Sequence, residues 1–171
     1  QEIVQLWINT PHAHKMDQPN YQALDEETFP IISLPEEKGK LAIVAGKYDG
    51  LQGPAKSKLD VLILRGDVLP GAAYTLNISA NYNTIIYILN GSLTINENEQ
   101  VAGLHLIHFN NDADNIHIST NQKTQFLVLS GIPLNEPIES YGPFVMTNQT
   151  EIMQAIRDYQ IGKMGVLIEE W

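Results

Sequence analysis

The chain contains no cysteine and few cationic side chains. The lack of cysteine excludes a disulfide scaffold, a thiolate metal site and a cysteine nucleophile. Lys and Arg number 10 against 20 Asp and Glu, and none of the cationic residues lies between positions 66 and 122. The formal net charge of −10 argues against nucleic-acid binding, because that binding depends on Lys and Arg that neutralise phosphates.

Long apolar runs are also missing, since no stretch approaches the ~18 uninterrupted apolar residues that would span a membrane. The chain begins Gln1-Glu2-Ile3-Val4 without an initiator Met or a signal peptide, so we expect a cut N-terminus and a cytoplasmic location. The 171 residues are 43% hydrophobic and 18% charged, which is ordinary for a globular protein and excludes intrinsic disorder. This length suits one domain.

Short apolar runs bounded by turn residues predict a mainly β chain. The segment 84–95 predicts a hairpin, because Asn90-Gly91 can adopt the positive φ angles of a type I′ turn. Pro70-Gly71 predicts a second turn. No helices alternate with the strands, so the pattern indicates an antiparallel sandwich or barrel. The predicted strands are Ile3–Asn9, Ile31–Ser33, Leu41–Ala45, Val61–Arg65, Tyr74–Ile78, Ile85–Leu89, Ser92–Ile95, Leu104–Phe109, Ile116–Ser119 and Gln125–Leu129.

One segment has helical periodicity, from Asn148 to Ile161. Asn148 followed by Glu151 predicts a capping box, and Gly162 provides a stop signal. We expect the apolar stripe of this helix to pack on the barrel or on a neighbouring domain. Its members are Ile152, Ala155, Ile156 and Tyr159.

The five histidines are the first candidates for chemistry. His12 and His14 have the H-x-H spacing that places two imidazoles on one side of an extended chain, but they lie in a Pro-rich connector over residues 10–40. His105 and His108 fall on one predicted strand and point to opposite faces, and His117 can pair with either across a sheet. We interpret the pair as solvated linker residues and the other three as structural. A metal site using His12, His14 and one of the others is the lesser alternative.

Other patterns add no active site. Asp67, Glu97, Glu99, Asp112 and Asp114 form no ligand-like cluster in the sequence, so we interpret them as an exposed face rather than a cation site. There is no G-x-S-x-G elbow and no phosphate loop. Glycosylation sequons begin at Asn77, Asn90 and Asn148, and we interpret them as chance. From the residues alone we therefore assign no catalytic, cofactor-binding or metal-ligating residue.

The C-terminal third closely resembles the signature of the pirin family. The resemblance begins with Gly131-Ile132-Pro133-Leu134-Asn135-Glu136-Pro137-Ile138 and continues with Tyr141-Gly142-Pro143-Phe144-Val145-Met146. The closing helix fits through Glu151-Ile152, Ala155, Asp158-Tyr159 and Gly162. Gln5-Leu6-Trp7-Ile8-Asn9, Pro11, Lys15-Met16, Pro19 and Tyr21 are similar to the inter-domain segment of that family, and the turns at Gly46, Gly53-Pro54, Pro70-Gly71 and Gly91 also match.

The resemblance implies half of a bicupin, which is a protein of two cupin barrels. The family places one metal centre, of three His and one Glu and usually with iron, in the N-terminal barrel. This chain resembles an inter-domain strand and linker over residues 1–20 and a C-terminal cupin domain over 21–171. The implied fold is a mainly β cupin jelly-roll barrel (a double-stranded β-helix) at about 40–140, with one amphipathic helix at about 148–161. No family metal ligand carries over to any position here.

Two functions follow from the resemblance and remain open. The first is a non-catalytic cupin domain that lacks its own metal site and acts as the structural and interaction half of a pirin-type protein. The alternative is the non-metal half of a quercetin 2,3-dioxygenase-like iron bicupin, so the parent protein can be an enzyme although this chain alone is not expected to be one. The expected partner is an N-terminal cupin domain or a second copy, with other proteins also open, and neither nucleic acid nor membrane.

Overall fold

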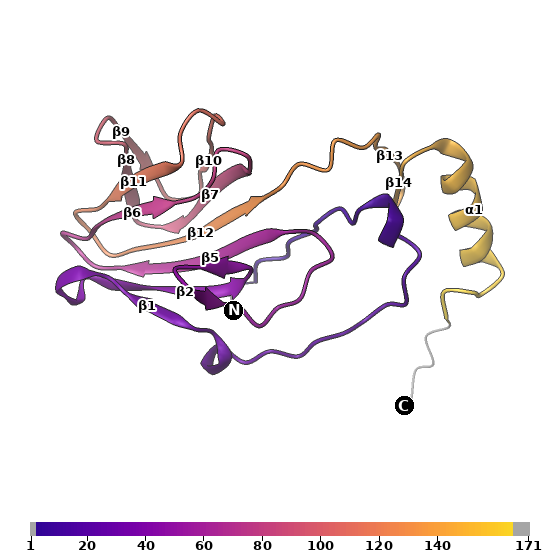
Figure 1. Ribbon diagram of the computed structural model, residues 1–171, viewed down its shortest axis with the longest axis horizontal. Coiled ribbons are helices and arrows are strands. Elements are labelled where there is room, and N and C mark those ends of the chain that lie inside the picture. Colours follow the sequence, from indigo (N-terminus) through magenta and orange to yellow (C-terminus); the bar gives the residue numbers. More distant parts are fainter. Residues whose placement is uncertain (1–2, 166–171) are drawn as a thin grey trace. The chain divides into compact units, whose positions relative to one another are not determined.

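The computed structural model describes residues 3–165, and the chain forms two compact units (Figure 1). The larger unit runs over residues 20–133. The smaller unit combines the residues up to Pro19 with those from Leu134 onward. The boundary expected at residue 20 is one between two domains of a longer protein. Contacts within this chain do not test such a boundary, so it stays a prediction. Gln1, Glu2 and residues 166–171, which the expected linker and domain include, lie outside the described residues.

Two antiparallel sheets make up most of the larger unit (Figure 1). In spatial order, the six-stranded sheet consists of β1 (Ile31–Ser33), β2 (Gly39–Ala45), β5 (Val61–Val68), β12 (Thr124–Gly131), β7 (Asn83–Asn90) and β10 (Leu106–His108). The four-stranded sheet consists of β6 (Ala73–Asn77), β11 (Asn115–Ser119), β8 (Ser92–Ile95) and β9 (Glu99–Ala102). The hairpin of β3 (Lys47–Tyr48) and β4 (Leu51–Gln52) and the 3-10 helices η2 (Glu26–Thr28) and η3 (Pro35–Glu37) complete this unit.

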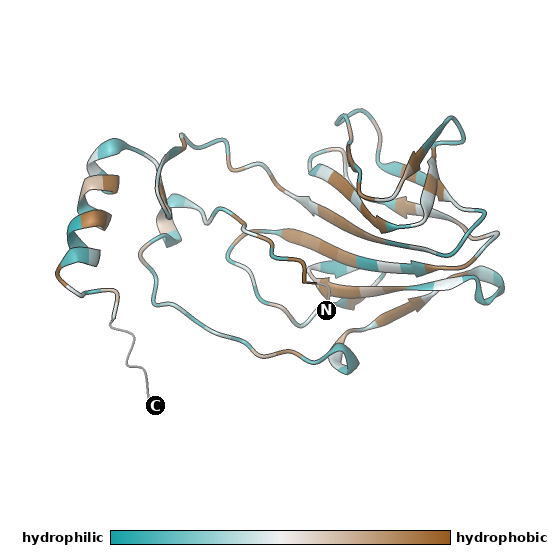
Figure 2. Cartoon of the chain, turned by 180° about the vertical axis from the view of Figure 1, so that it is seen from behind, coloured by the Kyte–Doolittle hydropathy of each residue, from teal (hydrophilic) through white to brown (hydrophobic). Residues whose placement is uncertain are grey.

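The core lies between these two sheets and is filled by side chains. Every second residue of a strand points inward, and Figure 2 shows apolar residues gathered on the strands while the loops are largely polar. Leu76, Ile86 and Ile88 are fully buried, and Tyr74 packs against them. A hollow lined in part by Leu34 measures only about 10 Å³, as expected for a small barrel whose interior is filled.

The two predicted turns have different outcomes. At Pro70-Gly71 the amide of Ala72 donates to the carbonyl of Leu69 over 3.0 Å, and Gly71 has φ 82°, so the turn is confirmed. The predicted hairpin at Asn90-Gly91 is wrong, because β7 and β8 belong to different sheets. Of the two residues only Gly91 has a positive φ, whereas a type I′ turn requires both, and the chain uses this corner to cross between the sheets.

The predicted strand Ile3–Asn9 is also wrong, because residues 3–9 have no regular secondary structure. Strand pairing requires a partner that supplies the ladder of hydrogen bonds, and the amphipathic pattern of a segment cannot provide one. The predicted strand Leu104–Phe109 is shorter in the structure, at Leu106–His108, because Leu104 has φ 64° and cannot continue an extended strand. The sequence did not predict the short strands β3, β4, β9, β13 (Glu139–Tyr141) and β14 (Phe144–Met146), because two to four residues give no clear period.

The smaller unit is built around the predicted helix. It holds the 3-10 helix η1 (His12–His14), the hairpin of β13 (Glu139–Tyr141) and β14 (Phe144–Met146), and α1 (Gln149–Gln160). Helix α1 packs on this hairpin, with Ile152 and Ala155 buried and the rings of Phe144 and Tyr159 meeting edge-to-face at 6.2 Å. Tyr159, expected on the buried stripe, is 65% exposed. Among the described residues no helix is long and apolar enough to cross a membrane.

Candidate functional site

One end of the barrel, here called its mouth, contains only a small hollow. The hollow at this end measures about 40 Å³ and lies beside the start of β7 and the residues around Asp114. Its polar lining includes Ser79, Tyr82, Thr84, Asn96 and Asp112. Such a volume holds about one water molecule, which is far below the ~300 Å³ of a typical ligand pocket.

Hydrogen bonds fix the polar groups around this mouth. The Tyr82 hydroxyl donates to Asp60 Oδ2 over 2.6 Å, and the amide of Ala80 donates to Asp114 Oδ1 over 2.7 Å. The carboxylate of Asp60 raises the pKa of Tyr82, because a phenolate would lose this hydrogen bond and face a like charge. The buried hydroxyls of Thr84 and Ser130 lie 2.8 Å apart. Throughout residues 3–165 no buried side-chain polar atom lacks a hydrogen-bond partner.

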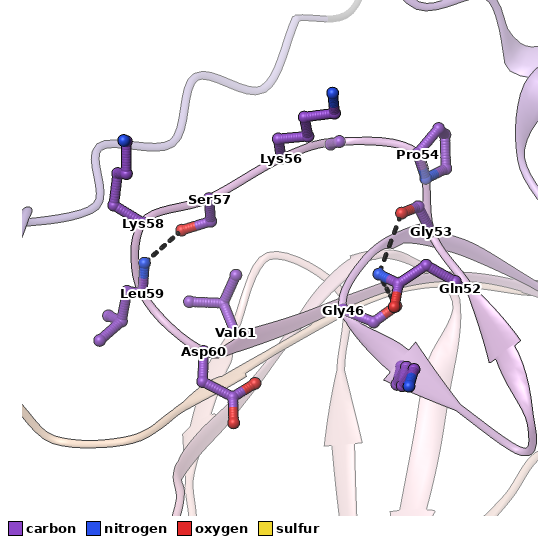
Figure 3. A pocket seen from close by; sticks show the side chains of 12 residues that line it. Gly46, Gln52, Gly53, Pro54, Lys56, Ser57, Lys58, Leu59, Asp60 and Val61 are labelled. Atoms are coloured by element: carbon purple, nitrogen blue, oxygen red, sulfur yellow. Dashed lines mark hydrogen bonds between the residues drawn. The ribbon is translucent and has the colours of Figure 1, made fainter.

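A larger hollow of about 850 Å³ lies under the loop over residues 53–60 (Figure 3). Both ends of this loop are tied down. Gln22 donates to the carbonyl of Pro54 over 3.0 Å and accepts from the amide of Lys56 over 3.2 Å, while the carbonyl of Asp60 accepts from the amide of Ile132. The hollow is therefore part of the fold and not an accident of a loose segment.

The groups around this hollow offer little catalytic chemistry. Lys56 and Lys58 extend from the outer side of the loop in Figure 3, away from Gly46 and Val61. The Gln52 amide donates to the carbonyls of Gly46 and Gly53, which occupies its N–H groups. The lining contains no His and, as its only carboxylate, Asp60, which is engaged by Tyr82. Its residues supply no pair of nucleophile and base.

The histidine pair of the connector does not form an H-x-H metal site. His12 and His14 lie in η1 and not on an extended chain, so the expectation that they share one side of such a chain is wrong. His12 Nε2 lies 2.8 Å from Glu151 Oε1, whereas His14 Nδ1 lies 3.0 Å from Asp17 Oδ2. Each imidazole thus has its own carboxylate.

The other three histidines are also apart. His108 lies on β10 of the six-stranded sheet and His117 on β11 of the four-stranded sheet, so the predicted option of pairing them across a sheet is wrong. His105 precedes β10, and its Nδ1 lies 3.0 Å from the carbonyl oxygen of Gly103. His117 lies opposite Thr75 on β6, with Nδ1 2.9 Å from Oγ1, which supports the structural interpretation of this residue.

The acidic residues singled out in the sequence lie at separate places. Of the five acidic residues singled out in the sequence, Asp67 accepts from Gln125, Asp114 from Ala80, and Asp112 lines the mouth. The other two lie beyond the mouth, Glu97 in the turn before β9 and Glu99 on β9. In the part of the chain that the structure describes, no three His, Asp or Glu side chains come close enough to hold a metal ion. The residues present do not fit the metal centre that cupins carry.

A cluster that the sequence did not predict connects the start of α1 with the connector. Asn148 Oδ1 accepts from the amide of Glu151 over 3.0 Å, which confirms the cap. The Glu151 carboxylate does not close a capping box on Asn148. Its Oε2 accepts from the amide and hydroxyl of Thr147 over 3.0 and 2.8 Å, and its Oε1 contacts His12. The hydrogen bonds from Thr147 lower the pKa of Glu151 most, and the contact with His12 also lowers it, so that the pKa is about 2. The pairing joins residues 139 positions apart, so no local signal could have found it.

Two of the three sequon asparagines are used by the fold. Asn90 Nδ2 donates to Gln125 Oε1 over 2.6 Å, and Asn148 caps α1. Asn77 ends β6, and its amide donates to the hydroxyl of Tyr48 over 3.1 Å. These roles are consistent with the interpretation of the sequons as chance.

Residues 63–165 match the family model for the pirin C-terminal cupin domain. The chain belongs to the pirin family. A protein of Pseudomonas aeruginosa whose name assigns it provisionally to the quercetin 2,3-dioxygenases is 36% identical over 162 residues, which are 95% of this chain and 56% of that protein. Human pirin is 29% identical over 167 residues, which are 95% of this chain and 57% of human pirin.

A solved structure gives the same result for the fold. The crystal structure of a quercetin 2,3-dioxygenase from Acinetobacter baumannii superimposes with a TM-score of 0.90 at 34% identity, covering 95% of this chain and 56% of that one. The predicted cupin fold with one C-terminal helix is thereby confirmed. This chain spans a little over half the length of the pirin relatives that it matches.

Proposed function

We propose that this chain is the half of a pirin-type protein that carries no metal, and that its role is structural and interactive. The observation that carries the proposal is the donor set of its barrel. The polar side chains that line the hollow of about 40 Å³ at the mouth are hydroxyls, amides and one carboxylate, that of Asp112. Iron sites in proteins need several His and carboxylate ligands in one place, so a barrel with this lining serves as a scaffold.

The pattern of residues 3–11 supports a second barrel as the other half. Val4, Leu6 and Ile8 alternate as Phe126, Val128 and Ser130 do on β12, and Pro11 follows at the same distance as Pro133. In β12 these alternate residues point into the core. Within this chain residues 3–9 have no strand partner, and Ile3 and Trp7 are 77% and 71% exposed. We infer that the segment is the equivalent of β12 in a second cupin.

A second candidate is an oxygenase half. The names of two relatives at 34–36% identity refer to quercetin 2,3-dioxygenase. In this version the parent protein binds iron in its other barrel and opens the flavonol ring with O₂, and the present chain forms a wall of that enzyme without metal. The role proposed for this chain is the same in both versions. They differ only in whether the parent protein turns over a substrate.

Oxygen uptake with quercetin and ferrous iron tests both versions. The 171-residue chain alone should consume no O₂ above the background of iron in buffer, and turnover by this chain would contradict the proposal. A protein containing both barrels should turn over quercetin if the second candidate is correct. If the two-barrel protein with bound iron shows no turnover, the scaffold role is the one that remains. The cytoplasmic location belongs to the same proposal and is tested by cell fractionation.

A further inference from the structure

The hollow of about 850 Å³, here named the loop hollow, collects cationic side chains although the chain is acidic overall. Lys47, Lys56 and Lys58 line it, and they are three of the 10 Lys and Arg residues of the chain. The one carboxylate among the lining residues, that of Asp60, accepts the hydroxyl of Tyr82 and points away from the loop hollow in Figure 3. The lining is therefore positive in a chain whose net charge is −10, and a positive cleft attracts anions.

Two of these lysines carry a charge that the fold does not compensate. Lys47 and Lys56 are exposed, and neither lies within ion-pair distance of a carboxylate among residues 3–165. Lys56 extends from the outer side of the loop in Figure 3. The four-carbon stem of a lysine is flexible, so this ammonium group can reach an anion at the rim of the loop hollow.

The inner wall of the loop hollow is apolar. In Figure 3 the side chain of Val61 points toward the loop, and Pro54 and Ala55 line the same space from the loop itself. The amide nitrogen of Gln52 is already engaged by two backbone carbonyls. A ligand that enters the loop hollow therefore meets methyl and methylene groups inside and ammonium groups at the rim.

Hydrogen bonds hold this shape before any ligand arrives. The amide of Gly53 donates to the carbonyl of Gly46 over 2.9 Å, and the amide of Ala55 donates to the carbonyl of Val44 over 3.0 Å. These bonds fix the first half of the loop, in addition to the contacts described above for its two ends. Because the loop is ordered in advance, a ligand does not have to supply the free energy of ordering it.

We propose that the loop hollow binds a small organic anion that has an apolar body and one carboxylate. The apolar body packs against Val61 and Pro54, and the carboxylate lies beside Lys47 and Lys56. The volume agrees with this class of ligand, because pockets for small molecules measure about 300–1,000 Å³. The loop hollow shares no lining residue with the hollow at the mouth of the barrel, so this inference goes beyond the proposed function and does not depend on it.

Titration of the isotope-labelled 171-residue chain with cinnamate, followed by amide chemical shifts, tests the proposal. Saturable shifts over residues 53–61 are expected, with a dissociation constant of about 1 mM for a ligand of this size. Cinnamylamine has the same apolar skeleton and the opposite charge at neutral pH, and it should bind at least ~10-fold more weakly. Inorganic phosphate, which has the charge without an apolar body, should also bind at least ~10-fold more weakly.

Substitution of the lysines tests the role of the rim. The double variant Lys47→Gln/Lys56→Gln should raise the dissociation constant of cinnamate by ~10-fold, because it removes both uncompensated charges. Lys40→Gln/Lys123→Gln is the matched control. It removes the same two charges at the end of β5 that is opposite to Val61, where Lys40 pairs with Asp67 and Lys123 precedes β12, and it should leave the constant unchanged.

Circular dichroism shows whether the variants are folded. If the double variant does not fold, the comparison of cinnamate with cinnamylamine on wild type decides the result. The inference would be overturned by an absence of saturable shifts over residues 53–61, by equal binding of cinnamate and either comparison compound, or by a wild-type constant in the folded double variant. Each of these measurements is independent of iron, so failure of this inference leaves the proposed function to its own test.

Discussion

Glu151 shows how much of the smaller unit depends on one carboxylate. Its carboxylate accepts hydrogen bonds from the backbone amide and the hydroxyl of Thr147 and contacts His12. The backbone amide of His12 in turn donates to Glu136 Oε2 over 2.8 Å. These contacts stabilise the charged form, and they lower the pKa of Glu151 from 4.5 to about 2. Because the pKa is lower in the folded state, ionised Glu151 makes its full contribution to stability above pH 4.5, and this contribution is lost as the pH falls toward 2.

Glu151→Gln therefore should change the pH dependence of unfolding. We predict that the melting temperature of wild type falls more steeply between pH 4.5 and pH 2 than that of Glu151→Gln, which has no charge to lose. Differential scanning calorimetry at several pH values gives the comparison. Glu99→Gln, on the edge strand β9, is the control and should follow the wild-type curve. Parallel curves for wild type and Glu151→Gln would contradict the assignment.

Gly66 is a residue whose missing side chain the core requires. A Cβ atom at this position would overlap the ring of Phe126, which is fully buried on the neighbouring strand β12. We predict that Gly66→Ala lowers the free energy of unfolding by roughly 1–3 kcal/mol through overpacking. Urea unfolding measures this loss. Gly103→Ala, whose Cβ would meet Asn90 Cα at 3.2 Å, should cost less, and equal losses would contradict the packing explanation.

At the scale of elements, the loop over residues 53–60 depends on Tyr82 at one end. We predict that Tyr82→Phe, which removes the hydrogen bond to Asp60, increases amide hydrogen exchange over residues 57–60 without changing exchange in β5 and β12. Tyr21→Phe is the matched control, because Tyr21 is 88% exposed. Unchanged exchange in this loop for Tyr82→Phe would mean that other contacts hold it.

The same scale explains which elements could be predicted from the sequence. The long alternating strand around Val128 and the capped helix at Asn148 carry local signals, and both were predicted correctly. Asn90-Gly91 carries a strong local signal as well, but the sheet to which the next strand belongs is a long-range property. The strand predicted over residues 3–9 has the right pattern and no partner in this chain.

The candidate site, too, has features that the sequence shows and features that it does not. The lack of His and Glu between Asn77 and Thr84 can be read directly from the sequence. The Tyr82–Asp60 bond and the His12–Glu151 pair join residues that are 22 and 139 positions apart. Contacts of this kind follow from the topology, so a single sequence does not reveal them.

At the scale of the whole molecule, the segment over residues 3–9 is the feature that the proposed function must explain. Ile3 and Trp7 are 77% and 71% exposed, and exposed apolar side chains that lie together mark surfaces that bind another protein. The proposed role as half of a two-barrel protein gives this segment a partner.

Iron binding by the purified chain tests this account most directly. The 171-residue chain is equilibrated with excess Fe²⁺ without oxygen, free metal is removed on a desalting column, and the bound metal is measured by elemental analysis. A specific site in a folded protein retains its metal through such a step, so the account predicts less than ~0.1 equivalent of iron per chain. A stoichiometry near ~1 would show that this barrel has a metal centre of its own and would contradict the account.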